Sequence, residues 1–166
     1  SDEKHSAVLA PDDLKDWRAT YEDTLSYEYE GWTVHKTHAW SQGPVLLQGL
    51  AILKGFDLGA MDPFGAEFVH TVTEAMKLAY ADREAYYGDP AQSEIPMEYL
   101  LSEEYNADRR KLITDKASTE QRPGRVPGFE QLADAYIERA ARDFNVGQVA
   151  AQEPTMSHRT EKRGDT

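Results

Sequence analysis

The chain has 166 residues, of which 40% are hydrophobic and 29% charged, as is typical of a globular domain or of one part of a larger protein. Its 30 acidic and 18 basic residues give a net charge of −12, which repels phosphate backbones and anionic lipids, so we expect neither nucleic acid nor a membrane as a partner. The sequence contains no cysteine, which excludes disulfides, thiolate nucleophiles and cysteine-based zinc sites.

The first predicted element is a short helix. A proline followed by two aspartates at positions 11–13 favours a helix start, because proline fits the first turn and carboxylates suit the positive end of the helix dipole. Leu14 and Trp17 lie three residues apart, so we expect both to face a core. The helix should end by Tyr21.

A β-hairpin is predicted next. Apolar and polar residues alternate over 25–29 and again over 32–37, which is the period of a strand. Glu30 and Gly31 separate the two runs, and glycine readily adopts the positive φ that a tight hairpin turn needs. The sequence therefore predicts two antiparallel strands joined at these residues.

Two helices follow, one buried and one amphipathic. Residues 44–53 are apolar nearly all round, which predicts a buried helix that ends at Gly55. Residues 66–87 repeat apolar side chains every three or four positions and are stopped by Gly-Asp-Pro at 88–90. The predicted inward face of this long helix carries Phe68, Val69, Val72, Ala75, Met76, Ala79 and Tyr80. The predicted outward face carries Lys77, Asp82 and Arg83.

The remaining sequence predicts two more helices and a tail. Residues 99–113 form one predicted helix, and residues 129–144 form the last one after a linker at 118–128 that contains two Pro-Gly pairs. Residues 145–166 offer little to bury, so we expect a flexible tail. The predicted fold is α+β, mostly helical with one hairpin, and residues 1–128 form its main segment.

Histidines and carboxylates suggest two metal-binding patterns, and both have a simpler interpretation. Glu67, His70 and Glu74 have the Glu-x-x-His spacing of carboxylate-bundle sites, but a polar stripe beside the apolar face is the favoured interpretation. His35 and His38 lie three apart near a strand, which puts them on opposite faces and favours surface histidines. We therefore expect no metal.

Several basic residues could clamp an anionic substrate. They comprise the run Arg109-Arg110-Lys111 together with Arg122 and Arg125. Such charges more often solvate a helix face or cap a helix C-terminus, and this is the favoured interpretation.

The loop at 40–43 reads Trp-Ser-Gln-Gly and precedes a predicted helix N-terminus, so it could bind an anion or a carbonyl oxygen. Its alternative role is a packed loop with Ser41 or Gln42 near the capping position. No partner base for Ser41 is visible in the sequence, so Ser41 is not a credible nucleophile.

Taken in order, several segments resemble the later part of the large subunit of γ-glutamyltransferases. The most specific is EAMKLAYADR at 74–83, followed by YGDP at 87–90. The others are LAPDDL at 9–14, YEGWTV at 29–34, LLQGLAILKGFDL at 46–58 and RPG at 122–124. The order and spacing of these pieces make the resemblance strong, although each is short.

The resemblance implies an N-terminal nucleophile hydrolase with an α/β/β/α fold and no cofactor. Such an enzyme is made as an inactive precursor that cuts its own backbone ahead of a threonine. Gly-Asp-Thr at 164–166 is similar to that junction, which implies cleavage between Asp165 and Thr166 and assigns Thr166 as the nucleophile. The implied substrate is a γ-glutamyl amide of the glutathione type, and the implied partner is the catalytic small subunit of the same precursor. This segment alone should be inactive, and it reads as a piece of a longer protein.

The loop at 38–44 departs from the family pattern, in which a proline-, serine- and glycine-rich loop stands at this place. The departure suggests an acylase of the same fold that acts on another amide. A further alternative is a standalone acidic helical interaction module without catalysis. The cellular compartment stays open between periplasmic or secreted and cytoplasmic.

Overall fold

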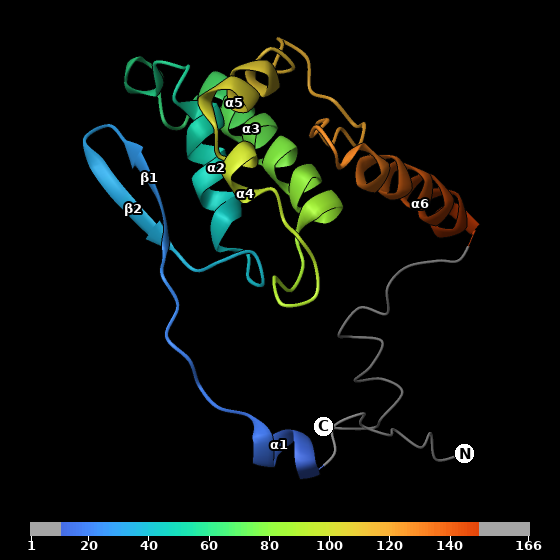
Figure 1. Cartoon of the computed structure of the whole chain (residues 1–166). Helices are drawn as coiled ribbons and strands as arrows, with labels where there is room; N and C mark the ends of the chain where they lie inside the picture. Colours follow the sequence, from blue (N-terminus) through green and yellow to red (C-terminus); the bar gives the residue numbers. More distant parts are fainter. Residues whose placement is uncertain (1–10, 150–166) are drawn as a thin grey trace, which may run out of the picture.

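The computed structural model describes residues 11–149, and its core is a set of helices beside a two-stranded sheet (Figure 1). The elements are α1 Pro11–Asp16, β1 Leu25–Tyr29, β2 Trp32–Lys36, α2 Gly43–Leu53, η1 Leu58–Ala60, α3 Ala66–Tyr86, α4 Met97–Leu100, α5 Glu103–Arg110 and α6 Glu130–Val149. The predicted α+β class with one hairpin is confirmed. Within the described residues, every helix is too short or too polar to cross a lipid bilayer.

The hairpin forms where the sequence predicts it. Strands β1 and β2 are antiparallel, and Tyr29 pairs with Trp32 across the turn. Glu30 and Gly31 both have positive φ, of 49° and 82°, as a type I′ turn requires. One face of the hairpin is half-buried and lies against α2, which leaves the other face exposed.

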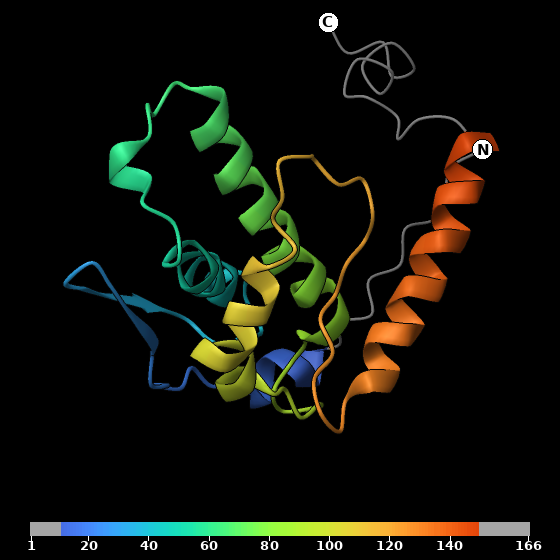
Figure 2. The same cartoon turned by 90° about the horizontal axis from the view of Figure 1, so that it is seen from above.

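The main hydrophobic core lies between α2 and α3, which are neighbours in two views (Figures 1 and 2). Its buried members are Val45, Ile52, Leu53, Ala75, Leu78 and Ala79. Gly49 on α2 permits close packing, because a Cβ built there would lie 2.7 Å from the sulfur of Met76. A second cluster joins the end of α3 to α4, α5 and the start of α6, through Tyr86, Leu100, Tyr105, Val126 and Ala133.

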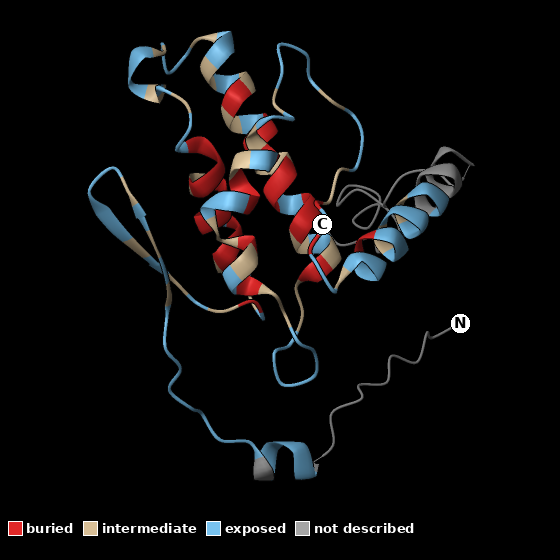
Figure 3. Ribbon diagram, turned by 45° about the horizontal axis from the view of Figure 1, so that its top comes forward, coloured by how far each residue is buried: buried red, intermediate tan, exposed pale blue. Residues whose placement is uncertain are grey.

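The buried face of α3 differs from the predicted one, which corrects the assignment of Asp82. Val69 and Tyr80 are exposed, whereas Asp82, predicted to face outward, is fully buried. The buried stripe runs through Thr71, Ala75, Leu78, Asp82 and Tyr86, all spaced three or four residues apart. Helix α3 is covered by α2 on one side and by the chain after α5 on another. Its buried surface, red in Figure 3, is therefore wider than the stripe formed by its apolar side chains.

The predicted helix at 99–113 is in fact two short helices, α4 and α5. The break lies at Ser102, whose hydroxyl accepts a hydrogen bond from the Tyr105 N–H at 3.3 Å and so caps α5. The side-chain amide of buried Asn106 donates to the Leu100 and Ser102 carbonyls, at 2.9 and 2.8 Å, and stabilises the bend. The last helix begins one residue after Phe129 and continues to Val149.

The prediction that Leu14 and Trp17 face a core is wrong. Their side chains are 73% and 69% exposed, and α1 stands apart from the other helices in Figure 1. The helix has only 6 residues, and the chain up to β1 is extended, so nothing in the described part of the molecule covers its apolar side chains.

Candidate functional site

The carboxylate of Asp82 is the centre of a buried polar network. Its Oδ2 accepts a hydrogen bond from Gln48 Nε2 of α2 at 2.6 Å. Its Oδ1 accepts from the Gly124 backbone N–H at 2.7 Å and from the Arg109 guanidinium of α5 at 3.1 Å. Burial raises the pKa of the Asp82 carboxyl above its ordinary value, and the Arg109 guanidinium and the Gly124 N–H offset part of that rise. One side chain therefore joins three segments that are distant in the sequence.

A second buried carboxylate, Glu74, binds the segment just before Gly124. Its Oε1 accepts from Lys77 and, at 3.3 Å, from the Ser118 backbone N–H, while its Oε2 accepts from the Arg122 guanidinium at 2.8 Å. We call residues 118–126 the anchored loop, because Glu74 binds its start and Asp82 binds its end. Glu74 is almost fully buried, so its predicted place on a solvated stripe is wrong.

The pKa of Glu74 makes the stability of this arrangement pH-dependent. Burial raises that pKa, but the hydrogen bonds from Lys77, Ser118 and Arg122 outweigh burial and hold it below the ordinary value of 4.5. A lowered folded-state pKa contributes stability above pH 4.5, and this contribution is lost as the pH falls through the folded-state pKa.

We expect Glu74→Gln to lower the free energy of unfolding by about 1–3 kcal/mol at pH 7, because it removes charge-assisted hydrogen bonds. The difference from the parent protein should shrink below pH 4.5, which urea unfolding at a series of pH values measures. Glu104→Gln is the matched control, since Glu104 is exposed and makes no side-chain hydrogen bond within residues 11–149. A pH-independent effect of Glu74→Gln would contradict the assignment.

The glycine of the Arg-Pro-Gly segment is required by close packing. The Tyr86 hydroxyl donates a hydrogen bond to the Gly124 carbonyl at 2.6 Å. A Cβ at position 124 would lie 2.1 Å from the Tyr105 hydroxyl, so a larger residue would displace the loop or the ring. Both polar groups of the Gly124 backbone are thus bound by α3, which fixes the chain just before it leads into α6.

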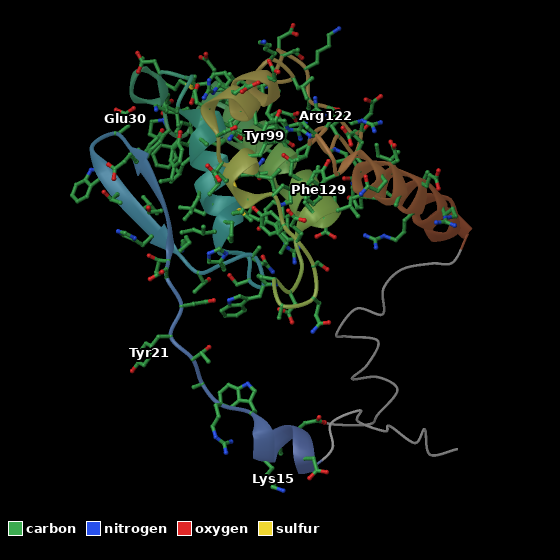
Figure 4. The ribbon with its side chains drawn as sticks, in the orientation of Figure 1. Lys15, Tyr21, Glu30, Tyr99, Arg122 and Phe129 are labelled. Carbon is green, nitrogen blue, oxygen red and sulfur yellow. The ribbon has the colours of Figure 1, made fainter. Side chains whose placement is uncertain are left out.

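The basic residues that could have formed an anion clamp are instead bound within the protein. Arg109 is buried against Asp82, and Arg122 lies between Glu74 and the Leu112 carbonyl. Arg110 donates to the Ala51 and Ile52 carbonyls at the C-terminal end of α2, and also binds Glu103. Lys111 pairs with Asp108 and Arg125 with Asp134, both on the surface. Figure 4 shows Arg122 among side chains of the helical part of the molecule. These contacts favour a structural role for the basic residues.

Within the described part of the chain, the histidines do not gather with carboxylates. His70 Nε2 lies 2.7 Å from the Thr114 carbonyl oxygen, Glu67 is exposed, and Glu74 is bound as described above. His35 Nδ1 lies 3.0 Å from the Thr24 hydroxyl. Within residues 11–149, no group of three or more histidines, aspartates and glutamates is placed to hold a metal ion.

Ser41 binds the first residue of α2, one position before the N-cap residue Gln42. Its hydroxyl oxygen accepts a hydrogen bond from the Gly43 N–H at 3.0 Å and donates to the His38 carbonyl at 3.0 Å. Ser41 therefore lies near the capping position, as the alternative interpretation of residues 40–43 predicts, but Trp40 and Gln42 are exposed, so the loop is not packed as expected. Gln42 makes no side-chain cap, which leaves its amide available.

The candidate nucleophile Thr166, the bond between Asp165 and Thr166, and the tail after residue 149 lie outside the described residues. Their assignment therefore stays a prediction. The residue that sequence reasoning missed is Asp82. Its spacing of four from both Leu78 and Tyr86 was the available signal, but a carboxylate on an apolar stripe is usually placed outward on residue type alone.

A sequence model described as gamma-glutamyltranspeptidase matches residues 2–153 of this chain. The chain is 29% identical over 147 residues to a protein of Escherichia coli strain K12 named glutathione hydrolase proenzyme, which covers 86% of this chain and 25% of that protein. The chain thus spans about a quarter of that relative's length.

Two solved structures resemble the chain closely in fold. LmbA2991HD is 51% identical with a TM-score of 0.69, over 77% of this chain and 21% of that chain. A cephalosporin acylase from Bacillus halodurans is 35% identical with a TM-score of 0.65, over 70% of this chain and 21% of that chain.

Proposed function

Because the chain belongs to the gamma-glutamyltranspeptidase family, we propose that it is the part of an amide-cleaving enzyme that precedes the catalytic threonine. The observation that supports the proposal is the match of the family over residues 2–153, and the proposed junction, Gly-Asp-Thr at 164–166, follows the matched segment in the sequence. The likeness to a relative named a proenzyme supports a precursor that must be cut.

In the proposed precursor, the Thr166 hydroxyl attacks the carbonyl carbon of Asp165 and the peptide bond becomes an ester. Water hydrolyses that ester, which leaves Thr166 with a free α-amine. In the mature enzyme the Thr166 hydroxyl attacks the substrate amide while its α-amine, with an ordinary pKa near 8, takes the proton. The leaving amine departs with a proton, and water or an acceptor amine then releases the acyl group.

The described residues supply the scaffold in this proposal. Asp82 and Glu74 bind the anchored loop to α3, and that loop leads through α6 toward the proposed cleavage site. The oxyanion donors and the substrate contacts belong, in this proposal, to the small subunit that begins with Thr166. The segment on its own would be inactive for that reason.

Two substrate classes fit the family. Amides of γ-glutamate are one, supported by the relative named glutathione hydrolase. Other acyl amides are the second, supported by the 35% identity to a cephalosporin acylase and by the divergent loop at 38–44. The alternative to an enzyme of either class is a standalone acidic module without catalysis.

The test is an assay of the full-length, self-cleaved protein with three amides of one chromogenic amine, whose acyl groups are γ-glutamyl, oxamyl and a β-lactam side chain. We expect hydrolysis of at least one amide, at a rate that falls to background in the uncleaved Thr166→Ala protein. The preferred acyl group identifies the substrate class. If the self-cleaved protein hydrolyses none of the three amides, both proposed substrate classes are rejected. If the full-length protein also fails to cleave itself, the result favours the non-catalytic module.

A further inference from the structure

A polar cavity of about 390 Å³ lies between the loop before α2 and the end of α3. Its walls include Trp40 and Gln42 from the loop and Arg83, Glu84 and Tyr87 from the end of α3 and the residue after it. The loop after β2 and the segment after α3 lie beside each other at this end of the helices in Figure 1. The volume is within the range of small-molecule sites, about 300–1,000 Å³.

The cavity wall includes two aromatic side chains, Tyr87 and the more exposed Trp40. The Trp40 side chain is 58% exposed, yet its Nε1 donates a hydrogen bond to the Glu22 carboxylate at 2.8 Å. The bond restricts rotation of the ring, and an exposed indole can stack against another ring. An exposed tryptophan that is held in place is better suited to bind a ligand than one that rotates freely, because less rotamer freedom is lost.

The cavity also has one positive and one negative group side by side. Arg83 and Glu84 are adjacent in the last turn of α3, bind each other and remain partly exposed. A guanidinium has five N–H donors and a carboxylate has several acceptor positions, so both keep capacity for a ligand. The Gln42 amide, which makes no cap, adds a further donor and acceptor at the rim.

From this arrangement we infer that the cavity binds a free α-amino acid with an aromatic side chain. Its carboxylate binds Arg83, its ammonium binds Glu84, and its ring stacks on Trp40. A zwitterion meets both charges, whereas Glu84 and the net charge of −12 disfavour a simple anion and Arg83 disfavours a simple cation. The inference goes beyond the proposed amide cleavage and does not depend on it, because it concerns binding alone.

The first experiment is calorimetric titration of the full-length Thr166→Ala protein with L-phenylalanine. We expect a dissociation constant in the millimolar range or tighter. Glycine lacks the ring, 3-phenylpropionate lacks the ammonium, and phenethylamine lacks the carboxylate, so each should bind about tenfold more weakly or worse. No measurable binding of L-phenylalanine, or equal binding of 3-phenylpropionate, would overturn the inference.

The second experiment assigns the binding to this cavity. Trp40→Ala, Arg83→Gln and Glu84→Gln should each weaken L-phenylalanine binding about tenfold or more. Trp40→Phe should weaken it less than Trp40→Ala, because an aromatic ring remains although its hydrogen bond to Glu22 is lost. Arg125→Gln is the matched control, since Arg125 is also an ion-paired surface arginine but does not line the cavity. Circular dichroism of each variant tests folding. Binding that is equal in folded Arg83→Gln and Arg125→Gln proteins would place the ligand elsewhere and refute the site.

Discussion

Replacing Thr166 with alanine should leave the full-length protein as a single chain, while the parent splits into a large and a small subunit. The hydroxyl is the atom that attacks the preceding carbonyl in the proposed self-cleavage, and alanine has none. Loss of the nucleophile slows hydrolases that use a side-chain nucleophile by on the order of 10⁴- to 10⁶-fold. At such a rate no cleavage should be visible. A denaturing gel over time measures the loss.

Two further variants make the test specific. Thr166→Ser keeps a hydroxyl and should still cleave, whereas Thr160→Ala removes another threonine of the same stretch and should leave cleavage unchanged. N-terminal sequencing of the small subunit should begin at Thr166. A small subunit that begins at any other residue, or a Thr166→Ala protein that still splits, would disprove the assignment of the nucleophile.

The largest expected effect on stability comes from Asp82. Asp82→Ala removes the acceptor of the buried Gly124 N–H and Gln48 amide. It also leaves the Arg109 guanidinium buried without its carboxylate partner, bound only to the Leu78 and Arg122 carbonyls. Breaking a buried ion pair from one side costs about 3–5 kcal/mol, and we expect a loss of this size in the free energy of unfolding. Urea unfolding of the full-length protein measures it, and hydrogen exchange of α3 amides localises it.

Two further variants test whether the loss of stability comes from the Asp82 network. Asp82→Asn should cost less, because the buried Gln48 Oε1 has no partner within the described residues and can accept from the new amide after Gln48 turns over. Asp134→Ala, which removes the carboxylate of an exposed pair with Arg125, should change stability by less than about 1 kcal/mol. A loss in Asp82→Ala no larger than in Asp134→Ala would show that the network does not hold the fold together.

Sequence reasoning predicted the elements whose signals are local. The turn at Glu30 and Gly31, the buried helix α2 and the end of α3 before Gly88 all depend on residues close in the chain, and all are confirmed. The break at Ser102 was missed, because its cap and the Asn106 side-chain bonds compete with a helix period that continues across it. Glu74 was placed on the surface because its partner Arg122 is 48 residues away.

By itself the sequence determined the α+β class, the hairpin and its turn, the positions of α2 and α3 and, through an ordered set of short segments, the enzyme family. Only the tertiary structure decided which polar residues lie inside. Asp82 and Glu74 are tolerated in the interior because donors from α2, α5 and the anchored loop converge on them, and no local pattern records that convergence. A carboxylate on a helix is buried or exposed according to what the rest of the chain brings to it, and that is a property of the fold.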